Sequence, residues 1–311
     1  MTRERLKGHA LIFSANLIFG INYPISKWLL AERLTPEFHT LARMVFACVM
    51  FWTLSFFLPK EKLPPKALLV LFICSFCGVA GNQALFIYGL SMTSPIDASV
   101  ITTGTPIFVM LLAAVILREP ITWLKTAGVL LGAAGAACLV AQSNPHGGSG
   151  AAIASVPGDL CVLASCVVYA IYFVFSKPLS EKYSAVTMMK WMFLFASAEV
   201  ALFAVPTISD GGILLEGATF DEKTFAAMAY VIGCATFLAY LLIPMAVRRI
   251  RPTTASMYNY VQPIVACALA AAIGQDSFSP GKLLATAAVF VGVYMVTKSK
   301  ARRDMIAAGE A

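Results

Sequence analysis

Ten long apolar runs dominate this sequence and limit what the chain can fold into. Each run has about 20 residues, which is the length that a helix needs to cross the hydrocarbon core of a bilayer. The runs lie at approximately residues 8–30, 37–58, 66–90, 95–117, 122–142, 157–177, 185–206, 224–247, 252–274 and 280–298. A membrane β-strand needs only about 10 residues of alternating polarity, so the runs indicate helices. We therefore predict an all-α integral membrane protein with ten transmembrane helices.

The composition excludes most classes of soluble protein. Of the 311 residues, 59% are hydrophobic and 13% are charged, whereas a soluble domain is about half apolar and a quarter charged. A water-soluble fold cannot bury so much apolar surface, which argues against a soluble enzyme, a nucleic-acid-binding domain and a disordered chain. The net charge of +7 does not require nucleic acid, because membrane proteins collect Lys and Arg in their cytoplasmic loops.

The distribution of the basic residues predicts the orientation of the chain. If the N-terminus is cytoplasmic, most of the 23 Lys and Arg residues lie on the cytoplasmic side. The positive-inside rule therefore favours a cytoplasmic location for both termini. The eight cysteines all fall inside apolar runs, and the C-x-x-C formed by Cys74 and Cys77 has no second pair or nearby His. We expect packed free thiols, with no metal and no cofactor.

A Gly-, Ser- and Ala-rich linker at 143–156 divides the chain into 1–142 and 157–311, each with five apolar runs. The halves resemble each other: at an offset of 157 residues, Pro106 matches Pro263 and Gly135 matches Gly292. Because five is an odd number, the second half must enter the membrane in the opposite orientation. The sequence thus predicts a 5+5 inverted-topology repeat, an architecture of secondary transporters that bind substrate near the membrane midplane.

The chain resembles the EamA-type transporters of the drug/metabolite transporter superfamily over its whole length. The resemblance is carried by the two sets of five runs, the G-x7-N-x3-G-x6-K pattern of the first run, the Pro-centred fourth and ninth runs, Arg118-Glu119, and the Gly-rich fifth run. It implies export or exchange of small metabolites through a central cavity, lined mainly by the first, third and fourth helices of each half. It also implies a place in the bacterial cytoplasmic (inner) membrane.

Polar residues in the first run are candidates for a cavity wall. Asn16, Gly20 and Tyr23 fall on one helical face, and Pro24 interrupts the helix near its predicted outer end. We predict substrate contacts at Asn16 and Tyr23, with a hinge at Gly20 and Pro24. The alternative is an ordinary hydrogen-bonded seam between membrane helices.

In both the fourth and the ninth run, two polar residues one turn apart stand before a proline. They are Thr102, Thr105 and Pro106 in the fourth run, and Asn259, Gln262 and Pro263 in the ninth. A proline removes a helix hydrogen bond and frees a carbonyl, so we predict a gate beside a substrate contact at each place. The alternative is a proline tolerated within a packed membrane helix. Further candidate substrate contacts are Asn82, Tyr88, Tyr169, Tyr172 and Tyr240.

Charged residues inside the runs are expensive in a membrane and are candidates for function. Arg43 and Lys190 occupy similar places in the second and seventh runs. Glu199 and Asp97 are the candidate coupling residues, since a buried carboxyl can carry a proton. The alternatives are that Glu199 neutralises a basic residue, that Arg43 and Lys190 extend to the membrane interface, and that Asp97 caps a helix.

These patterns favour a transporter over an enzyme. The sequence has no G-x-S-x-G, H-E-x-x-H or G-x-G-x-x-G motif in a suitable context. We predict a secondary-active transporter of a neutral, zwitterionic or mildly anionic solute such as an amino acid, working by alternating access. The alternatives are a lipid scramblase or flippase and a multidrug exporter. The expected partners are a small-molecule substrate and the bilayer, without nucleic acid; the oligomeric state stays open, a monomer included.

Overall fold

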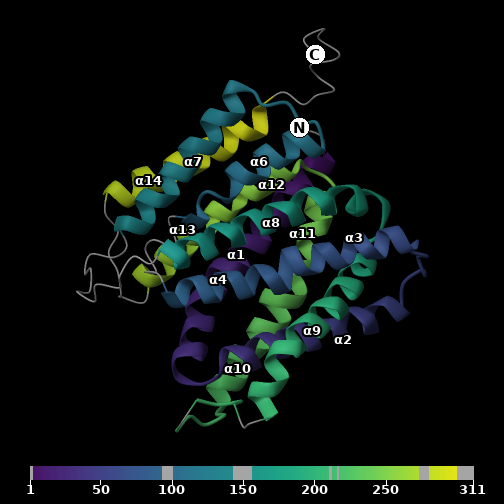
Figure 1. Ribbon diagram of the computed structural model, residues 1–311. Coiled ribbons are helices and arrows are strands. Elements are labelled where there is room, and N and C mark those ends of the chain that lie inside the picture. Colours follow the sequence, from purple (N-terminus) through teal and green to yellow (C-terminus); the bar gives the residue numbers. More distant parts are fainter. Residues whose placement is uncertain are drawn as a thin grey trace. The chain divides into compact units, whose positions relative to one another are not determined.

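The computed structural model describes residues 3–92, 101–142, 156–209, 212–215, 217–272 and 280–299. Within these ranges the chain is helical, apart from one isolated β-bridge between Leu34 and Leu214 (Figure 1). The prediction of an all-α chain is therefore confirmed for this part of the protein.

The helices follow the apolar runs of the sequence. In chain order they are α1 (Arg3–Glu32), α2 (Pro36–Phe56), α3 (Pro65–Ser75), the π-helical η1 (Phe76–Ala80), α4 (Gly81–Met92), α6 (Thr105–Ile116), α7 (Trp123–Gln142), α8 (Val156–Lys182), α9 (Ala185–Ser209), α10 (Glu222–Tyr230), the π-helical η2 (Val231–Leu238), α11 (Ala239–Val247), α12 (Pro252–Met257), the 3₁₀-helical η3 (Tyr258–Tyr260), α13 (Val261–Ala272) and α14 (Pro280–Lys298).

Among the described residues, five helical segments are long and apolar enough to cross a membrane. They are Pro36–Phe56, Pro65–Phe86, Val156–Lys182, Ala185–Pro206 and Glu222–Val247. Three further apolar helices, Thr105–Ile116, Trp123–Cys138 and Leu283–Lys298, are shorter. Ten crossings therefore stay a prediction, of which five are supported by helix length and composition.

The chain forms two compact units, and each unit combines parts of both sequence halves. The first unit contains Met1–Ala80 and Phe175–Arg249, and the second contains Gly81–Val174 and Ile250–Ala311. Residues far apart in the sequence therefore form the core of each unit.

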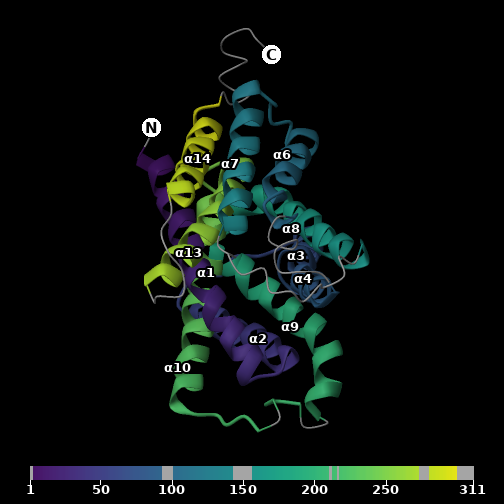
Figure 2. The same ribbon diagram turned by 90° about the vertical axis from the view of Figure 1, so that its left-hand side faces the viewer.

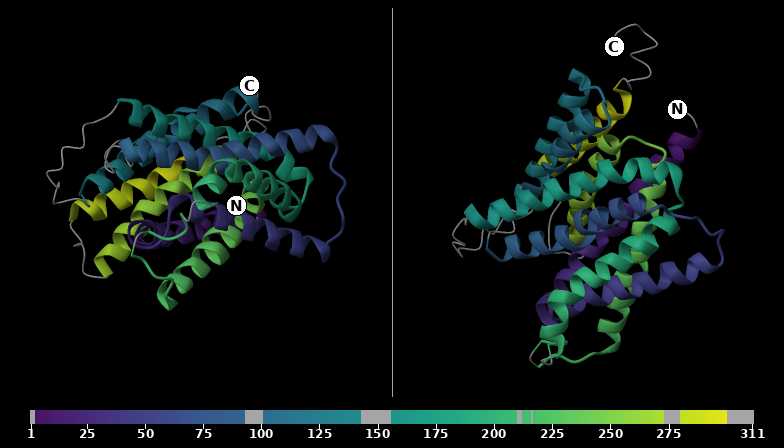
Figure 3. Two further views of the ribbon diagram at one scale, coloured as in Figure 1. Left: turned by 60° about the horizontal axis from the view of Figure 1, so that its bottom comes forward. Right: turned by 45° about the vertical axis from the view of Figure 1, so that its right-hand side comes forward.

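In the first unit, α2 and α9 run alongside each other (Figures 1 and 3). The buried face of α2 repeats every fourth residue, at His39, Arg43, Ala47 and Phe51, as helical periodicity requires. Phe51 stacks on Phe193 of α9 with ring centroids 5.5 Å apart. The apolar end of this face thus packs into the core, while its first two turns bring basic side chains into the same interior.

The loop that follows α1 and the loop that follows α9 are joined by backbone hydrogen bonds. Thr35 donates its N–H to the carbonyl of Ile213 over 3.2 Å, and Leu215 donates to the carbonyl of Arg33 over 3.0 Å. Asp221 then caps α10 by accepting from the N–H of Thr224 over 2.8 Å. Hydrogen bonds from the Thr224 side chain and backbone hold the pKa of the Asp221 carboxyl below its usual value.

In the second unit, α7 and α14 lie side by side in close contact (Figures 1 and 2). A Cβ added at Gly292 would meet the carbonyl oxygen of Gly128 at 2.5 Å and the backbone nitrogen of Gly132 at 2.8 Å. A Cβ at Gly135 would meet the carbonyl oxygen of Ala285 at 2.8 Å. Small residues therefore allow the two backbones to approach, as is common between membrane helices.

A buried ion pair stands where α7 begins. The Nζ of Lys125 lies 2.6 Å from Oε2 of Glu119, and the two side chains are 0% and 10% exposed. Thr253 of α12 donates a further hydrogen bond to Glu119 over 3.1 Å. The charge of the buried lysine is thus matched by a carboxylate that is itself hydrogen-bonded.

Candidate functional site

Both proline-centred runs are interrupted just before their proline, in the second unit. A turn at Thr103 and Gly104 precedes α6, and Pro106 lies in the first turn of that helix. The 3₁₀ segment η3 precedes α13, in which Pro263 is the third residue. Proline is accepted in a first turn because it needs no amide hydrogen bond there. The helices therefore break where the sequence indicates; the role of these breaks as gates stays a prediction.

The two interruptions contact each other. The hydroxyl of Tyr260, in η3, donates to the carbonyl of Thr103 over 2.9 Å. The Tyr260 side chain is 1% exposed and packs in an apolar cluster with Met110, Val129 and Met257. A buried phenol requires a partner for its hydroxyl, and the turn before α6 supplies one because its carbonyls are not used by a regular helix.

The polar residues beside the two prolines differ in their burial and in their hydrogen bonds within the same turn. Thr105 is buried and donates its hydroxyl proton to the carbonyl of Thr102 over 2.8 Å, a hydrogen bond within the same turn. Thr102, Asn259 and Gln262 are half-buried. The Asn259 and Gln262 amides therefore sit at the boundary of the packed core beside the interrupted segment.

Aromatic residues of α8 form a second group in this unit. The rings of Tyr169 and Tyr172 stack with centroids 5.8 Å apart, and Phe173 meets Tyr169 edge-on at 5.1 Å. One turn earlier, the carbonyl of Ser165 accepts from Nδ2 of Asn82 over 2.9 Å. The predicted contacts Asn82, Tyr169 and Tyr172 thus lie near each other along α4 and the first part of α8.

The predicted residues Asn16, Gly20 and Tyr240 belong to the first unit. Asn16 and Gly20 are buried on α1, and Nδ2 of Asn16 donates to the carbonyl of Ile12 over 2.8 Å. Tyr240 of α11 is buried and meets Phe19 of α1 edge-on, with centroids 5.8 Å apart. The predicted face of α1 is therefore turned to the interior of its unit.

Four of the predicted residues fall wholly or partly outside what the structure describes. Asp97 lies outside the described residues, and the side chains of Tyr23, Pro24 and Tyr88 are likewise not described. Their assignments as coupling, hinge and substrate residues stay predictions.

The first unit contains two π-helical segments that the sequence analysis did not anticipate. The segment η1 covers Phe76–Ala80 in the third apolar run, and η2 covers Val231–Leu238 in the eighth. Shifted by the repeat offset of 157, η1 falls on residues 233–237, within η2. Such segments are rare in helices and are often found at functional sites.

Each π-helical region bonds to a charged side chain on a neighbouring helix. Arg43 of α2 donates from Nε to Oγ1 of Thr236, in η2, over 2.9 Å. Ser75, directly before η1, donates to Oε2 of Glu199 on α9 over 3.3 Å and to the carbonyl of Met192 over 2.8 Å. The other carboxyl oxygen of Glu199 is buried and has no hydrogen-bond partner in the described chain.

The three charges inside α2 and α9 do not neutralise one another. In the described part of the chain, Arg43, Lys190 and Glu199 form no ion pair. The Nζ of Lys190 instead lies 5.1 Å from the ring centre of Trp52. Ser75 and Thr236 are functional candidates that sequence reasoning missed. Their only signal was the presence of the three charges, each of which needs a polar partner from another helix.

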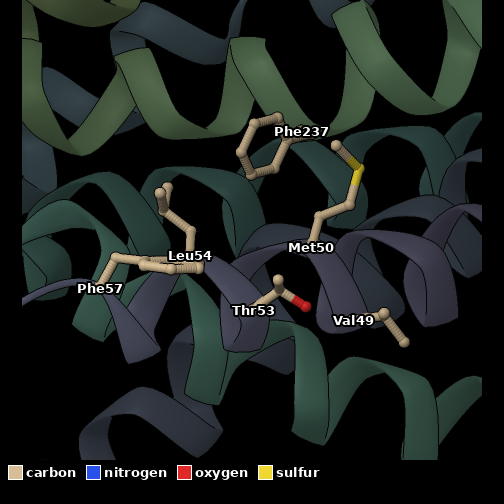
Figure 4. A pocket seen from close by; sticks show the side chains of 6 residues that line it. All are labelled: Val49, Met50, Thr53, Leu54, Phe57 and Phe237. Atoms are coloured by element: carbon tan, nitrogen blue, oxygen red, sulfur yellow. The ribbon is translucent and has the colours of Figure 1, made fainter.

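One open apolar groove lies on the surface of the first unit (Figure 4). It has a volume of about 270 Å³ and is lined by Val49, Met50, Thr53, Leu54, Phe57 and Phe237. The hydroxyl of Thr53 is the only polar side-chain group among these residues. None of the predicted substrate contacts lines this groove, whose chemistry suits a hydrocarbon chain better than a polar solute.

The chain is similar in sequence to known proteins over most of its length. A family model described as "EamA-like transporter family" matches residues 6–141 and again residues 156–298. The chain is 24% identical to the uncharacterized transporter YetK of Bacillus subtilis, over all of this chain and 92% of that protein. It is 25% identical to a probable terminal-alkyne amino-acid exporter of Streptantibioticus cattleyicolor, over 73% of this chain and 72% of that protein.

More distant relatives share the whole length of the chain. The protein WALLS ARE THIN 1 of Arabidopsis thaliana is 20% identical over 99% of this chain and 86% of its own length. A solved crystal structure superposes with a TM-score of 0.76 at 18% identity, over 93% of this chain and 96% of the other. At this level of identity, the superposition shows a shared fold.

Proposed function

Because the chain belongs to the EamA-like transporter family, we propose that it is a secondary-active transporter that exports or exchanges a small metabolite by alternating access. The observation that carries this proposal is the contact between the two interrupted helices, Tyr260 to Thr103. Discontinuous helices at equivalent places in two halves are typical of transporters, which use them at the substrate site. Interrupted backbone is tolerated at membrane depth only where protein or a water-filled cavity surrounds it.

The proposed topology is ten membrane helices arranged as two inverted repeats, 1–142 and 157–311, joined by 143–156. It is supported by the two separate matches of the family model and by the π-helical segments at equivalent positions in the third and eighth runs. We expect both termini in the cytoplasm and the protein in a bacterial inner membrane.

The proposed substrate is an amino-acid-like or other neutral, zwitterionic or mildly anionic solute. Half-buried amide and hydroxyl groups at Thr102, Asn259 and Gln262 can hydrogen-bond such a solute, and the stacked tyrosines of α8 offer apolar surface with polar edges. The amino-acid exporter of Streptantibioticus cattleyicolor among the relatives supports this choice. The proposed substrate contacts are Asn16, Tyr23, Asn82, Tyr88, Thr102, Thr105, Tyr169, Tyr172, Tyr240, Asn259 and Gln262, with Gly20, Pro24, Pro106 and Pro263 as hinges.

The test is flux into proteoliposomes, measured for a panel of amino acids and purine or pyrimidine metabolites with and without a pH gradient. We expect saturable flux of one solute class. In the double variant Asn259→Ala/Gln262→Ala, transport should weaken while the amount of folded protein stays the same. Thr53→Val, in the apolar groove, is the matched control and should transport as the wild type does.

Three results would contradict the proposal. Unchanged uptake kinetics in the double variant would refute the placement of the substrate beside Asn259 and Gln262. No flux of any solute, together with movement of fluorescent lipid between leaflets, would favour a scramblase. Flux of many unrelated organic cations would instead favour a multidrug exporter.

A further inference from the structure

Arg43 is a buried cation without a carboxylate. Its side chain lies on the interior face of α2, and the residue is 8% exposed. In the described part of the chain it forms no ion pair, and its one hydrogen bond is to Thr236. A guanidinium in a membrane interior is normally paired or marks a path for a ligand or ion.

The chain treats its other buried cation differently. Arg43 and Lys125 are the two buried Lys or Arg residues of the described chain. Lys125 forms an ion pair with Glu119 over 2.6 Å, and Thr253 supports the same carboxylate. The buried charge of Lys125 thus has its counterion within the chain, whereas the described residues provide none for Arg43.

The end of the Arg43 guanidinium is left with unused donors. Arginine has five N–H groups, of which the hydrogen bond to Thr236 uses the one on Nε. The two Nη nitrogens make no hydrogen bond within the described chain, and they are not among its fully enclosed polar atoms. Two adjacent Nη donors form the planar fork that matches a carboxylate in a bidentate arrangement.

The π-helical segment η2 holds this fork in a defined orientation. The hydroxyl of Thr236 donates to the carbonyl of Val231 over 2.7 Å, five residues earlier, so its oxygen is free to accept from Nε of Arg43. With Nε held on η2, the remaining edge of the guanidinium points away from Thr236. A preorganised arginine loses less entropy when it binds a ligand.

Within the described chain, the surroundings of Arg43 include no carboxylate that pairs with it, but they include several aromatic rings. His39 lies one turn earlier on the same face and is buried, and the His39 imidazole and the Tyr240 phenol both lie within electrostatic reach of Arg43. Glu199 accepts a hydrogen bond from Ser75 through one carboxyl oxygen. Tyr240 contacts the rings of Phe19 and Phe193. Tyr240 and Phe193 are buried, whereas Phe19 is half-buried, so an apolar body attached to an anionic group would lie against Phe19.

We propose that Arg43, oriented by Thr236, is a binding site for the carboxylate group of the transported solute. This inference rests on the proposed function as a small-metabolite transporter and narrows its substrate to carboxylates with an aliphatic or aromatic body. The two Nη groups donate to the carboxylate oxygens, and the half-buried ring of Phe19 contacts the apolar part.

The first test is binding to the purified full-length protein, read as a shift of its thermal unfolding midpoint. The probes are phenylacetate, L-phenylalanine and L-leucine, compared with the uncharged phenylacetamide and with chloride at the same concentration. We expect stabilisation by at least one carboxylate and none by the amide or by chloride. Stabilisation by chloride to the same extent would assign the site to inorganic anions and overturn the proposal, as would the absence of any shift with all three carboxylates.

Variants then assign the shift to Arg43. Arg43→Gln should abolish the shift of the unfolding midpoint. Arg43→Lys keeps the charge but not the two-pronged donor geometry. It should weaken the affinity about tenfold, which corresponds to the loss of one good hydrogen bond. Valine has the shape of threonine without the hydroxyl, so Thr236→Val should weaken the affinity several-fold. If Arg43→Gln does not fold, Thr236→Val tests the role of Arg43 in its place. Lys190→Gln removes the lysine of α9; it is the control and should bind as the wild type does. An unchanged shift in both Arg43→Gln and Thr236→Val would overturn the proposal.

Transport measurements separate this inference from the proposed function. If the protein carries solutes but Arg43→Gln and Thr236→Val carry carboxylates and amides as the wild type does, the carboxylate site is wrong and the transporter remains. If Arg43-dependent binding is seen but no solute moves, the site stands and the transport proposal is wrong.

Discussion

The hydroxyl of Tyr260 lies 2.9 Å from the carbonyl oxygen of Thr103 and donates a hydrogen bond to it. The two residues stand at equivalent positions of the ninth and fourth apolar runs, 157 residues apart. Each belongs to the short irregular segment that precedes a proline-containing helix, α13 or α6. This contact ties together two interruptions that the local sequence indicates separately.

Replacing Tyr260 by Phe tests what this hydrogen bond contributes. The ring keeps its packing in the core of the second unit, but the Thr103 carbonyl loses a buried donor, which costs about 1–3 kcal/mol of stability. Thermal unfolding in detergent should show a lowered midpoint. Tyr294→Phe, at an exposed tyrosine of α14, is the control and should leave the midpoint unchanged; an equal effect of the two variants would contradict the role given to Tyr260.

The close approach of α7 and α14 should be sensitive to a single methyl group. In Gly292→Ala the new Cβ would meet backbone atoms of Gly128 and Gly132, which cannot move aside without separating the helices. We expect a loss of roughly 1–3 kcal/mol, as for other overpacked cores. Gly233→Ala, where a Cβ has nothing within 4 Å, should keep or slightly raise the stability. Chemical denaturation followed by Trp fluorescence measures both variants.

Replacing one partner of the buried ion pair at the start of α7 should lower the stability more than replacing both partners. Glu119→Gln leaves Lys125 buried without its counterion, and we expect a loss of about 3–5 kcal/mol. In the double variant Glu119→Gln/Lys125→Met no charge is stranded, so most of the stability should return. Thermal unfolding of the single and double variants distinguishes the cases; a double variant as unstable as the single one would show that Lys125 is not the source of the loss.

The loop between α2 and α3 should make stability depend on pH. Glu61 accepts from the backbone N–H of Ser184, the residue before α9, over 3.0 Å. Burial acts to raise the pKa of Glu61, but hydrogen bonds from Thr187 and Ser184 outweigh it and hold the pKa below its usual value of 4.5. The folded state thus favours the ionised form, a contribution that is present above the unfolded pKa and lost as the pH falls through the folded one.

Glu61→Gln should therefore lower the unfolding midpoint at neutral pH, and its difference from the wild type should shrink in buffers more acidic than the lowered pKa. Unfolding curves across this range measure the difference. Lys60→Gln, at the exposed neighbouring residue, is the control. A gap between Glu61→Gln and the wild type that widens on acidification would have the wrong sign for this contact.

Glu199 is the described residue best placed to carry a proton. One of its oxygens accepts from Ser75, while the other is buried without a partner. If it couples transport to protons, Glu199→Gln should exchange solute but no longer respond to a pH gradient across proteoliposomes. Ser75→Ala keeps the carboxyl and should keep the response. Equal acceleration by the gradient in the wild type and in Glu199→Gln would exclude this residue from coupling.

Local patterns were sufficient to predict the helical runs and to single out the two prolines beside which runs are interrupted. Apolar length sets the helical runs, because a backbone in lipid must satisfy its own hydrogen bonds. The division of the chain at the linker 143–156 stays a prediction; the family model matches residues 6–141 and 156–298. The breaks before Pro106 and Pro263 were predictable because proline acts on its own helix.

The partners of the charged side chains could not be predicted in this way. The bond from Arg43 to Thr236 joins residues 193 positions apart, and that from Ser75 to Glu199 joins residues 124 apart. Nothing in the spacing along one helix indicates which face of another helix it meets. The π-helical segments were equally hidden, since an α-helix and a π-helix have the same apolar composition.

The sequence by itself determined that this chain is a helical membrane protein of a transporter family, because hydropathy and proline act over a few residues. The tertiary structure decided which charges are neutralised. Lys125 meets Glu119, whereas Arg43 bonds to a hydroxyl and, within the described residues, its two Nη nitrogens have no partner. The physical reason is that the energy of a buried charge depends on the groups placed around it by packing, and those groups come from distant parts of the chain.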